Sequence, residues 1–248
     1  RKSTSGIYDY FSELFLLQNT MFFDHGNLTL ECNPNSNSLS TFLSNIRFEK
    51  KEKTGIIGGD HYITYVIVKK LIEILNRPLL IIQFDAHHDC GSEILRIDQT
   101  VHHANFIRFL LREEKVKKVI QIGVRGLRAL GQRLEDKEKL VQVPSHRSSQ
   151  INLQSMIAAV KEEYGENLLI YISMDVDVLN PSEFSLVDFP KQGGLSTFQV
   201  IELLQGIRSF KSQLVGFDLV EGQGDGNLDD YDNVLQILIH MMDLMGED

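Results

Sequence analysis

Several features of secreted and membrane proteins are missing from this 248-residue sequence. It has only two cysteines, Cys32 and Cys90, which are too few for a disulfide framework in a chain long enough to bury a core. No apolar run approaches the roughly 20 residues of a membrane-spanning helix, and the first residues lack the charged-then-apolar order of a signal peptide. We therefore expect a cytoplasmic protein with no membrane partner.

An excess of positive charge is also missing. The chain has 25 Lys and Arg residues against 34 Asp and Glu residues, a formal net charge of -9 at pH 7. Because a nucleic-acid partner is normally matched by a basic stripe or patch, no nucleic acid is expected. The 42% hydrophobic and 24% charged residues are the balance of a globular protein. From this length and composition we expect residues 1–248 to form a single domain.

From Thr54 onward, short apolar runs rich in β-branched residues alternate with longer amphipathic stretches. This order predicts an α/β fold with three layers, in which helices cover both faces of a central, mainly parallel sheet. Strands are expected at Thr54 to Ile57, Leu79 to Phe84, Lys118 to Ile122, Leu140 to Val143, Leu168 to Met174 and Gln213 to Leu219. Helices are expected at His61 to Leu75, His103 to Glu113, Leu153 to Tyr164, Thr197 to Ser209 and Asp232 to Leu244.

The first fifty residues follow a different, atypical pattern. Their apolar spacing predicts a helix from Ile7 to Leu17, and the Asn- and Ser-rich stretch from Asn33 to Ser38 predicts an exposed loop. The function of this segment is not indicated by its residues.

Three short segments place metal-binding side chains immediately after a predicted strand. They are Gly58-Gly59-Asp60-His61, Asp85-Ala86-His87-His88-Asp89 and Ser173-Met174-Asp175-Val176-Asp177. Open parallel sheets bind their ligands beyond the carboxyl ends of the strands. We therefore expect the three segments to surround one cavity.

Strand geometry selects the residues that can converge there. Asp85 and His87 project to the same side of an extended backbone, as do Asp175 and Asp177, and a turn after the strand would return Asp89 to the same cavity. Together with the histidine of the first segment, the predicted metal ligands are His61, Asp85, His87, Asp89, Asp175 and Asp177.

Two residues that lie next to these predicted ligands in the sequence are interpreted differently. Asp60 stands at a predicted helix start, where a carboxylate commonly caps the helix, and His88 points away from its neighbours. For the other six residues, four carboxylates and two imidazoles suit a pair of divalent cations, most naturally manganese, although nickel, cobalt and zinc accept the same ligands. Without cations the carboxylates would repel each other and take up protons.

The three motifs, in this order, resemble those of the ureohydrolase family, which includes arginase, agmatinase, guanidinobutyrase and formimidoylglutamase. The resemblance runs from about Ile56 to the carboxyl terminus and extends to Gly193-Gly194-Leu195-Ser196 and to the segment from Gly216 to Glu221. It implies an arginase-like α-β-α fold, two manganese ions bridged by a hydroxide, a small guanidino or amidino substrate, and a homo-oligomer, either a trimer or a hexamer.

The resemblance also implies a role for each residue. One metal ion would be held by His61, Asp85, Asp89 and Asp175, and the other by Asp85, His87, Asp175 and Asp177. Catalytic roles fall to Asp177, to Glu221, which would hold the guanidinium, and to His103, which would carry protons to the leaving amine. The adjacent His102 could occupy the position of His103 instead.

The substrate is inferred from departures from the family pattern. Cys90-Gly91-Ser92-Glu93 replaces the Asn- and Thr-rich loop with which arginases hold arginine, and the segment from Gln121 to Gly126 looks like that of agmatinases. This favours hydrolysis of agmatine to urea and an amine, a reaction of polyamine biosynthesis. The alternatives are arginase, guanidinobutyrase or formimidoylglutamase activity, cleavage of another carbon–nitrogen bond such as that of an acylated amine, and a non-catalytic metal-binding homologue.

Overall fold

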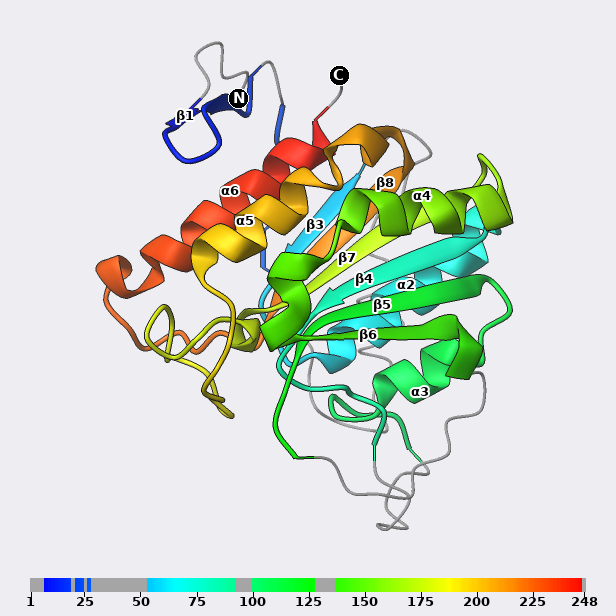
Figure 1. Cartoon of the computed structure of the whole chain (residues 1–248), viewed down its shortest axis with the longest axis horizontal. Helices are drawn as coiled ribbons and strands as arrows, with labels where there is room; N and C mark the ends of the chain where they lie inside the picture. Colours follow the sequence, from blue (N-terminus) through cyan, green and yellow to red (C-terminus); the bar gives the residue numbers. More distant parts are fainter. Residues whose placement is uncertain are drawn as a thin grey trace.

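A parallel β-sheet forms the centre of the computed structural model (Figure 1), which describes residues 7–18, 21–24, 26–27, 53–91, 100–127 and 137–246. Within these ranges the sheet has six strands in the order β3-β8-β7-β4-β5-β6, and every neighbouring pair is parallel. The strands are β3 (Thr54–Ile57), β4 (Leu79–Phe84), β5 (Val116–Val124), β6 (Leu140–Pro144), β7 (Leu169–Asp175) and β8 (Leu214–Val220).

Helices cover both faces of the sheet, which confirms the predicted three-layer α/β fold. Figure 1 shows α4, α5 and α6 in front of the sheet and α2 and α3 behind it. Their bounds are α2 (Tyr62–Leu75), α3 (Phe106–Leu111), α4 (Leu153–Tyr164), α5 (Thr197–Gln205) and α6 (Asp232–Met245). No described helix has the length and apolar character that crossing a membrane requires.

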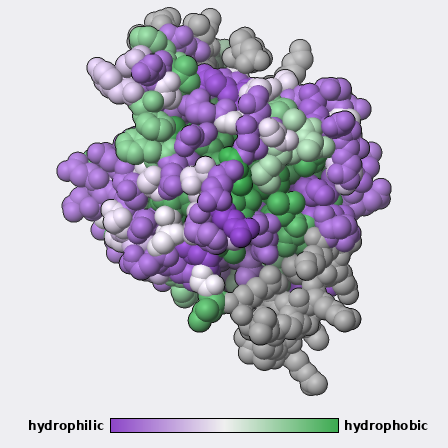
Figure 2. Space-filling view, viewed as in Figure 1, coloured by the Kyte–Doolittle hydropathy of each residue, from purple (hydrophilic) through white to green (hydrophobic). Residues whose placement is uncertain are grey.

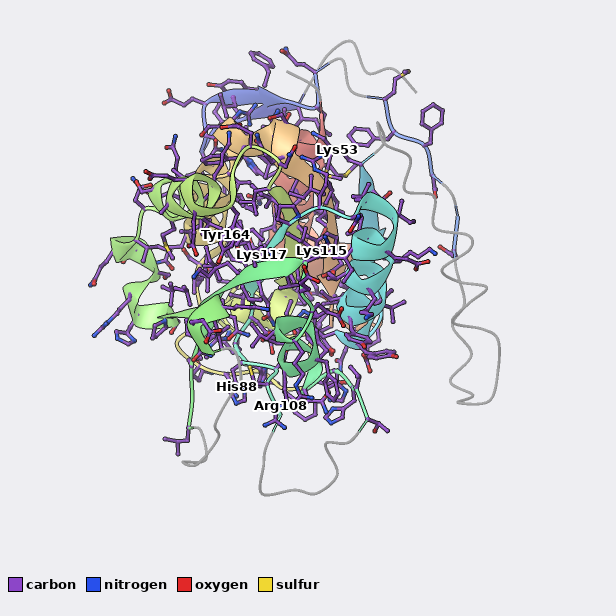
Figure 3. All side chains as sticks on the ribbon, turned by 90° about the vertical axis from the view of Figure 1, so that its right-hand side faces the viewer. Lys53, His88, Arg108, Lys115, Lys117 and Tyr164 are labelled. Atoms are coloured by element: carbon purple, nitrogen blue, oxygen red, sulfur yellow. The ribbon has the colours of Figure 1, made fainter. Side chains whose placement is uncertain are left out.

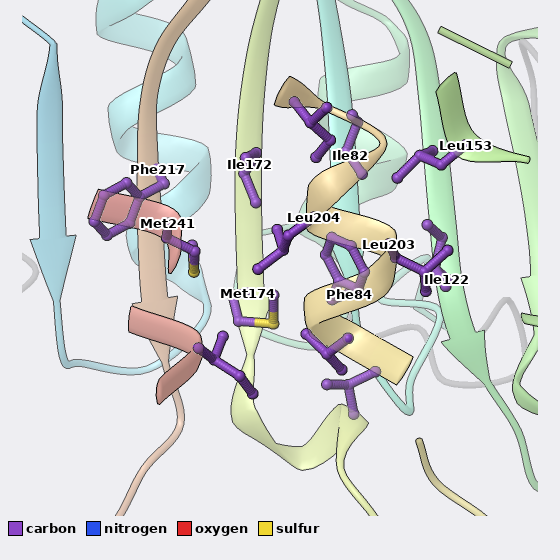
Figure 4. Packing of buried hydrophobic residues seen from close by; sticks show 14 of the residues in the cluster. Ile82, Phe84, Ile122, Leu153, Ile172, Met174, Leu203, Leu204, Phe217 and Met241 are labelled. Atoms are coloured by element: carbon purple, nitrogen blue, oxygen red, sulfur yellow. The ribbon is translucent and has the colours of Figure 1, made fainter. Parts of the chain in front are cut away.

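The buried strand β4 explains why the sheet needs two helical layers. Its side chains alternate, so that Ile82 and Phe84 belong to the core beneath α4, α5 and α6, whereas Leu79 and Ile81 belong to the core beneath α2 and α3. Figure 4 shows Ile82 and Phe84 close to Leu204 of α5. Burying each such side chain contributes about 1.5–3 kcal/mol, so a strand that is apolar on both faces is stable only between two layers.

Helix α3 begins later than the sequence predicted, at Phe106 rather than His103. The side chain of Asn105 accepts a hydrogen bond from the His102 backbone N–H (2.8 Å) and donates one to the Thr100 carbonyl (3.0 Å). These local bonds compete with helix formation and fold the preceding residues into a turn. His103 therefore lies in the turn before the helix.

The predicted helix from Ile7 to Leu17 is wrong. These residues contain an antiparallel hairpin of β1 (Ile7–Asp9) and β2 (Leu14–Leu16). The Asp9 carboxylate accepts a hydrogen bond from the Ser12 backbone N–H (2.7 Å), and Glu13 has a positive φ of 54°, so the chain turns back where a helix would continue. The predicted loop from Asn33 to Ser38 lies outside the described residues.

The hairpin is attached to α6. Leu16 is buried, and the Leu17 backbone N–H donates to the carboxylate of Asp243 (2.8 Å). On the outer side of the hairpin, Tyr10 and Phe15 are exposed. Figure 2 shows a mostly hydrophilic face, with apolar atoms visible near the hairpin at the upper left.

Candidate metal centre

The three motifs meet at the carboxyl ends of β3, β4 and β7. Gly58 and Gly59, with φ of 95° and 86°, turn the chain after β3 and bring His61 to the start of α2. Asp85 follows the last residue of β4, and Asp175 ends the neighbouring strand β7. The sheet order thus brings together side chains that are far apart in the sequence, as the sequence predicted.

One group of ligands surrounds the ring of His61. Its Nδ1 atom lies 3.2 Å from a carboxylate oxygen of each of three residues, Asp85, Asp89 and Asp175. Its other nitrogen, Nε2, is 2.9 Å from Ser173 Oγ, which directs Nδ1 toward the carboxylates. Within the described part of the chain, Nδ1 is buried without a hydrogen bond of good geometry. A buried ring nitrogen facing three carboxylates fits the position of a metal ligand.

A second group shares Asp85 with the first. His87 Nδ1 lies 2.7 Å from Asp177 Oδ2 and 3.6 Å from Asp85 Oδ1. The other oxygen of Asp85, Oδ2, is the one that faces His61. In each of the two sets, His61-Asp85-Asp89 and Asp85-His87-Asp177, the ligand atoms lie within 4.8 Å of one another. Asp85 thus presents one carboxylate oxygen to each group.

The charges of the site require positive compensation. Burial disfavours a charged His61, yet the nearby carboxylates of Asp175, Asp85 and Asp89 raise its pKa well above the ordinary value. Burial also opposes protonation of His87, but the carboxylates of Asp177 and Asp85 raise its pKa to about 10. Burial and the charge of Asp85 raise the pKa of Asp89 and Asp175. Divalent cations bound among these carboxylates would supply the positive charge that the site requires.

A buried hydrogen-bond network supports His61 from behind. Ser173 Oγ, which contacts the ring, donates to Asp218 Oδ1 (2.9 Å). The other oxygen of Asp218 accepts hydrogen bonds from Thr64 Oγ1 (2.8 Å) and the Tyr171 hydroxyl (2.8 Å). Burial raises the pKa of Asp218, although these three hydrogen bonds lower it. The network fixes the orientation of the His61 ring.

A row of glutamines supports the carboxylates from the other side. Gln83, Gln121 and Gln142 lie in register on β4, β5 and β6. Gln142 donates to Gln121 (2.7 Å), Gln121 donates to Gln83 (2.7 Å), and Gln83 donates to Asp85 (2.6 Å) and Asp89 (3.0 Å). The row therefore ends on two of the predicted metal ligands.

Arg125 joins the strand ends beneath the site. Among the described residues, its guanidinium donates hydrogen bonds to backbone carbonyls alone, those of Gly123, Asp177, Val178, Leu179 and Lys191, at 2.7–3.2 Å. Burial lowers its pKa, whereas the charges of Asp177, Asp85 and Asp175 raise it. Sequence reasoning assigned no role to Arg125, to Asp218 or to the glutamines. For Asp218 and the glutamines, the available signal was a polar residue inside an otherwise apolar strand, whereas Arg125 directly follows β5.

Of the three predicted catalytic residues, Asp177 belongs to the cluster, and Glu221 and His103 lie beside it. Glu221 follows β8 with a positive φ of 66°, and its Oε1 accepts a hydrogen bond from the His61 backbone N–H (2.7 Å). Burial raises the pKa of Glu221. His103 is half-exposed, with Nδ1 3.5 Å from Asp60 Oδ2. The Asp60 carboxylate also accepts a hydrogen bond from Tyr62 N–H (2.7 Å), but the N-cap position of α2 is His61, one residue after Asp60.

These groups open into a cavity of about 740 Å³. Its walls include His61, His87, Asp89, Asp175, Asp177 and Glu221, and both His102 and His103 also line it. His88 lines the cavity too, but its Nδ1 accepts a hydrogen bond from Cys90 N–H (3.0 Å), consistent with its exclusion from the ligands. Figure 3 shows His88 at the end of the molecule opposite Lys53.

A parallel sheet with paired His and Asp groups at its carboxyl end defines an α/β protein built to hold metal ions. A family model described as the arginase family matches residues 2–226, and the chain belongs to this family. The resemblance drawn from the three motifs is thereby confirmed.

Known proteins support this placement. N(1)-aminopropylagmatine ureohydrolase from Thermus thermophilus is 32% identical over 190 residues, which are 77% of this chain and 61% of that protein. Guanidinopropionase from Pseudomonas aeruginosa is 30% identical over 178 residues, 66% of this chain and 51% of that protein. The chain thus spans about half to three-fifths of the length of these relatives. The crystal structure of a putative agmatinase from Clostridium difficile superimposes with a TM-score of 0.72 at 22% identity, covering 97% of this chain and 84% of that one.

Proposed function

We propose that the protein is a hydrolase that binds two divalent metal ions, most naturally Mn²⁺, and cleaves the guanidino group of a small substrate to urea and an amine. The observation that supports this most strongly is the position of the Asp85 carboxylate between two imidazoles. One of its oxygens faces His61 and the other faces His87. A carboxylate shared in this way is suited to bridge two cations. His61, Asp85, Asp89 and Asp175 would hold one ion, and Asp85, His87, Asp175 and Asp177 the other.

Two divalent cations held by these residues would supply a hydroxide at neutral pH and would stabilise the negative charge that develops on the substrate. The protein's own groups would bind and orient the substrate. Glu221 is half-buried on the cavity wall and would accept hydrogen bonds from the planar guanidinium, which sets the position of its carbon. His103, near Asp60 on the same wall, would carry a proton to the departing amine.

Agmatine is the substrate that the sequence alone favours, and it is one of the compounds to assay. The names of relatives at about 30% identity range from N(1)-aminopropylagmatine ureohydrolase to guanidinopropionase, so the family accommodates different substrate tails. What these names share is a guanidino group, which is the part of the substrate that this proposal specifies.

The proposal is tested by incubating the full chain with Mn²⁺ and measuring product release from four compounds. Urea would be measured with agmatine, arginine and 4-guanidinobutyrate, and formamide with formimidoylglutamate. Urea release from at least one guanidino compound, lost on chelation and restored by Mn²⁺, is the expected result. Two bound metal ions without turnover of any compound would favour a non-catalytic metal-binding homologue, and release of an amine from acylated amines alone would favour a deacylase.

A further inference from the structure

The groups discussed so far contact the guanidinium and the metal ions, whereas the far end of a substrate would meet a different part of the cavity wall. We propose that Lys191 binds a carboxylate at that end, so that guanidino acids are preferred to agmatine. This inference rests on the proposed function and specifies the substrate class within it.

The backbone of Lys191 is fixed next to the metal-binding residues. Its carbonyl accepts hydrogen bonds from Arg125 Nε (3.2 Å) and Nη2 (2.9 Å). The same Nη2 donates to the carbonyl of Asp177 (2.7 Å). The carbonyls of Lys191 and Asp177 are therefore less than two hydrogen-bond lengths apart, and Lys191 belongs to the wall of the same cavity.

The side chain of Lys191 lies over Gly126. A Cβ atom at Gly126 would stand 3.4 Å from the Lys191 Nζ and 3.5 Å and 3.6 Å from its Cδ and Cε. Gly126 also has a φ of +87°, which L side chains rarely adopt. Glycine is therefore favoured at this position, and the absence of a side chain leaves room for Lys191. Both residues line the cavity, and the lysine side chain is half-buried against it.

The charge of Lys191 is available to a ligand. Among the residues that the structure describes, its ammonium group has no ion pair or hydrogen bond. Arg125, the other Lys or Arg side chain on the described wall, directs its donors to backbone carbonyls. Asp188 also lines the cavity, but it is exposed and accepts a hydrogen bond from Gln223 Nε2 (2.6 Å). A half-buried ammonium without a partner favours an anionic group on the bound molecule.

The wall near His87 is suited to a methylene chain. The ring of Phe189 is 62% exposed, and its centroid lies 6.4 Å from that of His87 with the two rings nearly perpendicular. Phe189 and Val124 both line the cavity and offer apolar surface to a short alkyl chain. Agmatine would present a second cation to Lys191 at the end of this chain, whereas a guanidino acid would present a carboxylate.

The test compares the metal-loaded full chain with four variants, using 4-guanidinobutyrate, agmatine and the uncharged-tail compound butylguanidine. Lys191→Met is expected to lower kcat/KM for 4-guanidinobutyrate by about tenfold or more, because a charge-assisted hydrogen bond is lost, and to leave butylguanidine nearly unchanged. Lys191→Arg should retain the preference for the acid, and Lys191→Glu should shift it toward agmatine. Lys70→Met is the control. It changes the net charge by the same amount as Lys191→Met, but on the exterior of α2, and is expected to leave kcat/KM unchanged for all three compounds.

A binding measurement separates this inference from the proposed function. Titration calorimetry of 4-guanidinobutyrate into the manganese-loaded protein requires no turnover. Affinity about tenfold weaker in Lys191→Met than in Lys70→Met supports the role of Lys191 even if no urea is formed. Equal affinity in the two variants, or a wild-type preference for agmatine that Lys191→Met leaves unchanged, would overturn it. Absence of urea from every compound counts against the proposed function alone.

Discussion

The side-chain amide of Gln83 donates hydrogen bonds to Asp85 at 2.6 Å and to Asp89 at 3.0 Å, so one neutral donor holds two of the candidate metal ligands. All three residues are buried. An amide donor in this position fixes the direction of the carboxylates without neutralising them, which leaves their charge for a cation. Gln83, which supports the ligands, thus belongs to β4 and lies two residues before Asp85.

Replacing Gln83 with methionine is expected to weaken metal binding by about tenfold, within the range found for residues that orient metal ligands. Methionine has a similar volume and removes the donor, while Gln121 keeps its hydrogen bond to the His88 carbonyl (2.7 Å). Mn²⁺ affinity would be measured by calorimetry, with circular dichroism to verify folding. Gln142→Met, at the far end of the row, is the control. Equal affinities in both variants would show that the row does not support the ligands.

Much of the fold and of the cluster could be predicted from sequence because the signals are local. The apolar runs predict the strands β4 and β7. The motifs at the ends of these runs predict that Asp85 and Asp175 lie at the carboxyl end of the sheet. The contribution of Asp218 was not predictable in the same way. Its role depends on contacts with Ser173 and Tyr171, which are set by the register of β7 and β8.

The hairpin shows a second limit of sequence reasoning. The apolar spacing from Ile7 to Leu17 fits a helix, but the turn depends on the Asp9–Ser12 hydrogen bond and on the unusual φ of Glu13. Docking against Asp243, more than two hundred residues later, adds a tertiary contact that no local pattern contains. The position of Lys191 could not be predicted from sequence for the same reason. It depends on the hydrogen bond with Arg125 and on the space above Gly126.

Replacing Asp175 with alanine is expected to abolish binding of both metal ions, because the proposal makes Asp175 a ligand of each. Metal content would be measured by mass spectrometry after dialysis, with Asp60→Ala as the control. Asp60 belongs to the same group of motifs, but its carboxylate contacts Tyr62 and His103. Two ions per chain retained in Asp175→Ala would show that the ligand assignment is wrong.

Replacing His103 with asparagine is expected to lower kcat by about a hundredfold while leaving metal content intact, because general acid catalysis contributes at least this much. The matched variant His102→Asn decides between the two neighbouring histidines. Both side chains line the cavity, and His103 is the one near Asp60. A larger loss of turnover in His102→Asn would transfer the proton-carrying role to His102.

The contact between the hairpin and α6 predicts that acid destabilises the protein. Burial lowers the pKa of His240 below its ordinary value of 6.5, although the nearby charges of Asp9 and Asp243 raise it and that of Arg208 lowers it further. The unfolded chain therefore binds a proton more readily than the folded chain. Stability is present above pH 6.5 and is lost as the pH falls through the lowered pKa.

Thermal unfolding between about pH 7 and pH 5 measures this effect, since an unperturbed histidine titrates in that range. His240→Gln removes the titrating group and should make the melting temperature less dependent on pH. His146→Gln, on an exposed histidine beyond β6, is the control and should keep the wild-type slope. A slope in His240→Gln as steep as that of the wild type would contradict the account.

The central claim is that six side chains from three segments hold two divalent ions that share Asp85. The most direct measurement is a crystal structure of the protein soaked in manganese, with anomalous diffraction recorded to locate the ions. Two anomalous peaks are expected, one beside His61 Nδ1 and one beside His87 Nδ1, with Asp85 contacting both. Peaks that lie elsewhere, or a fully formed cavity without any peak, would contradict it.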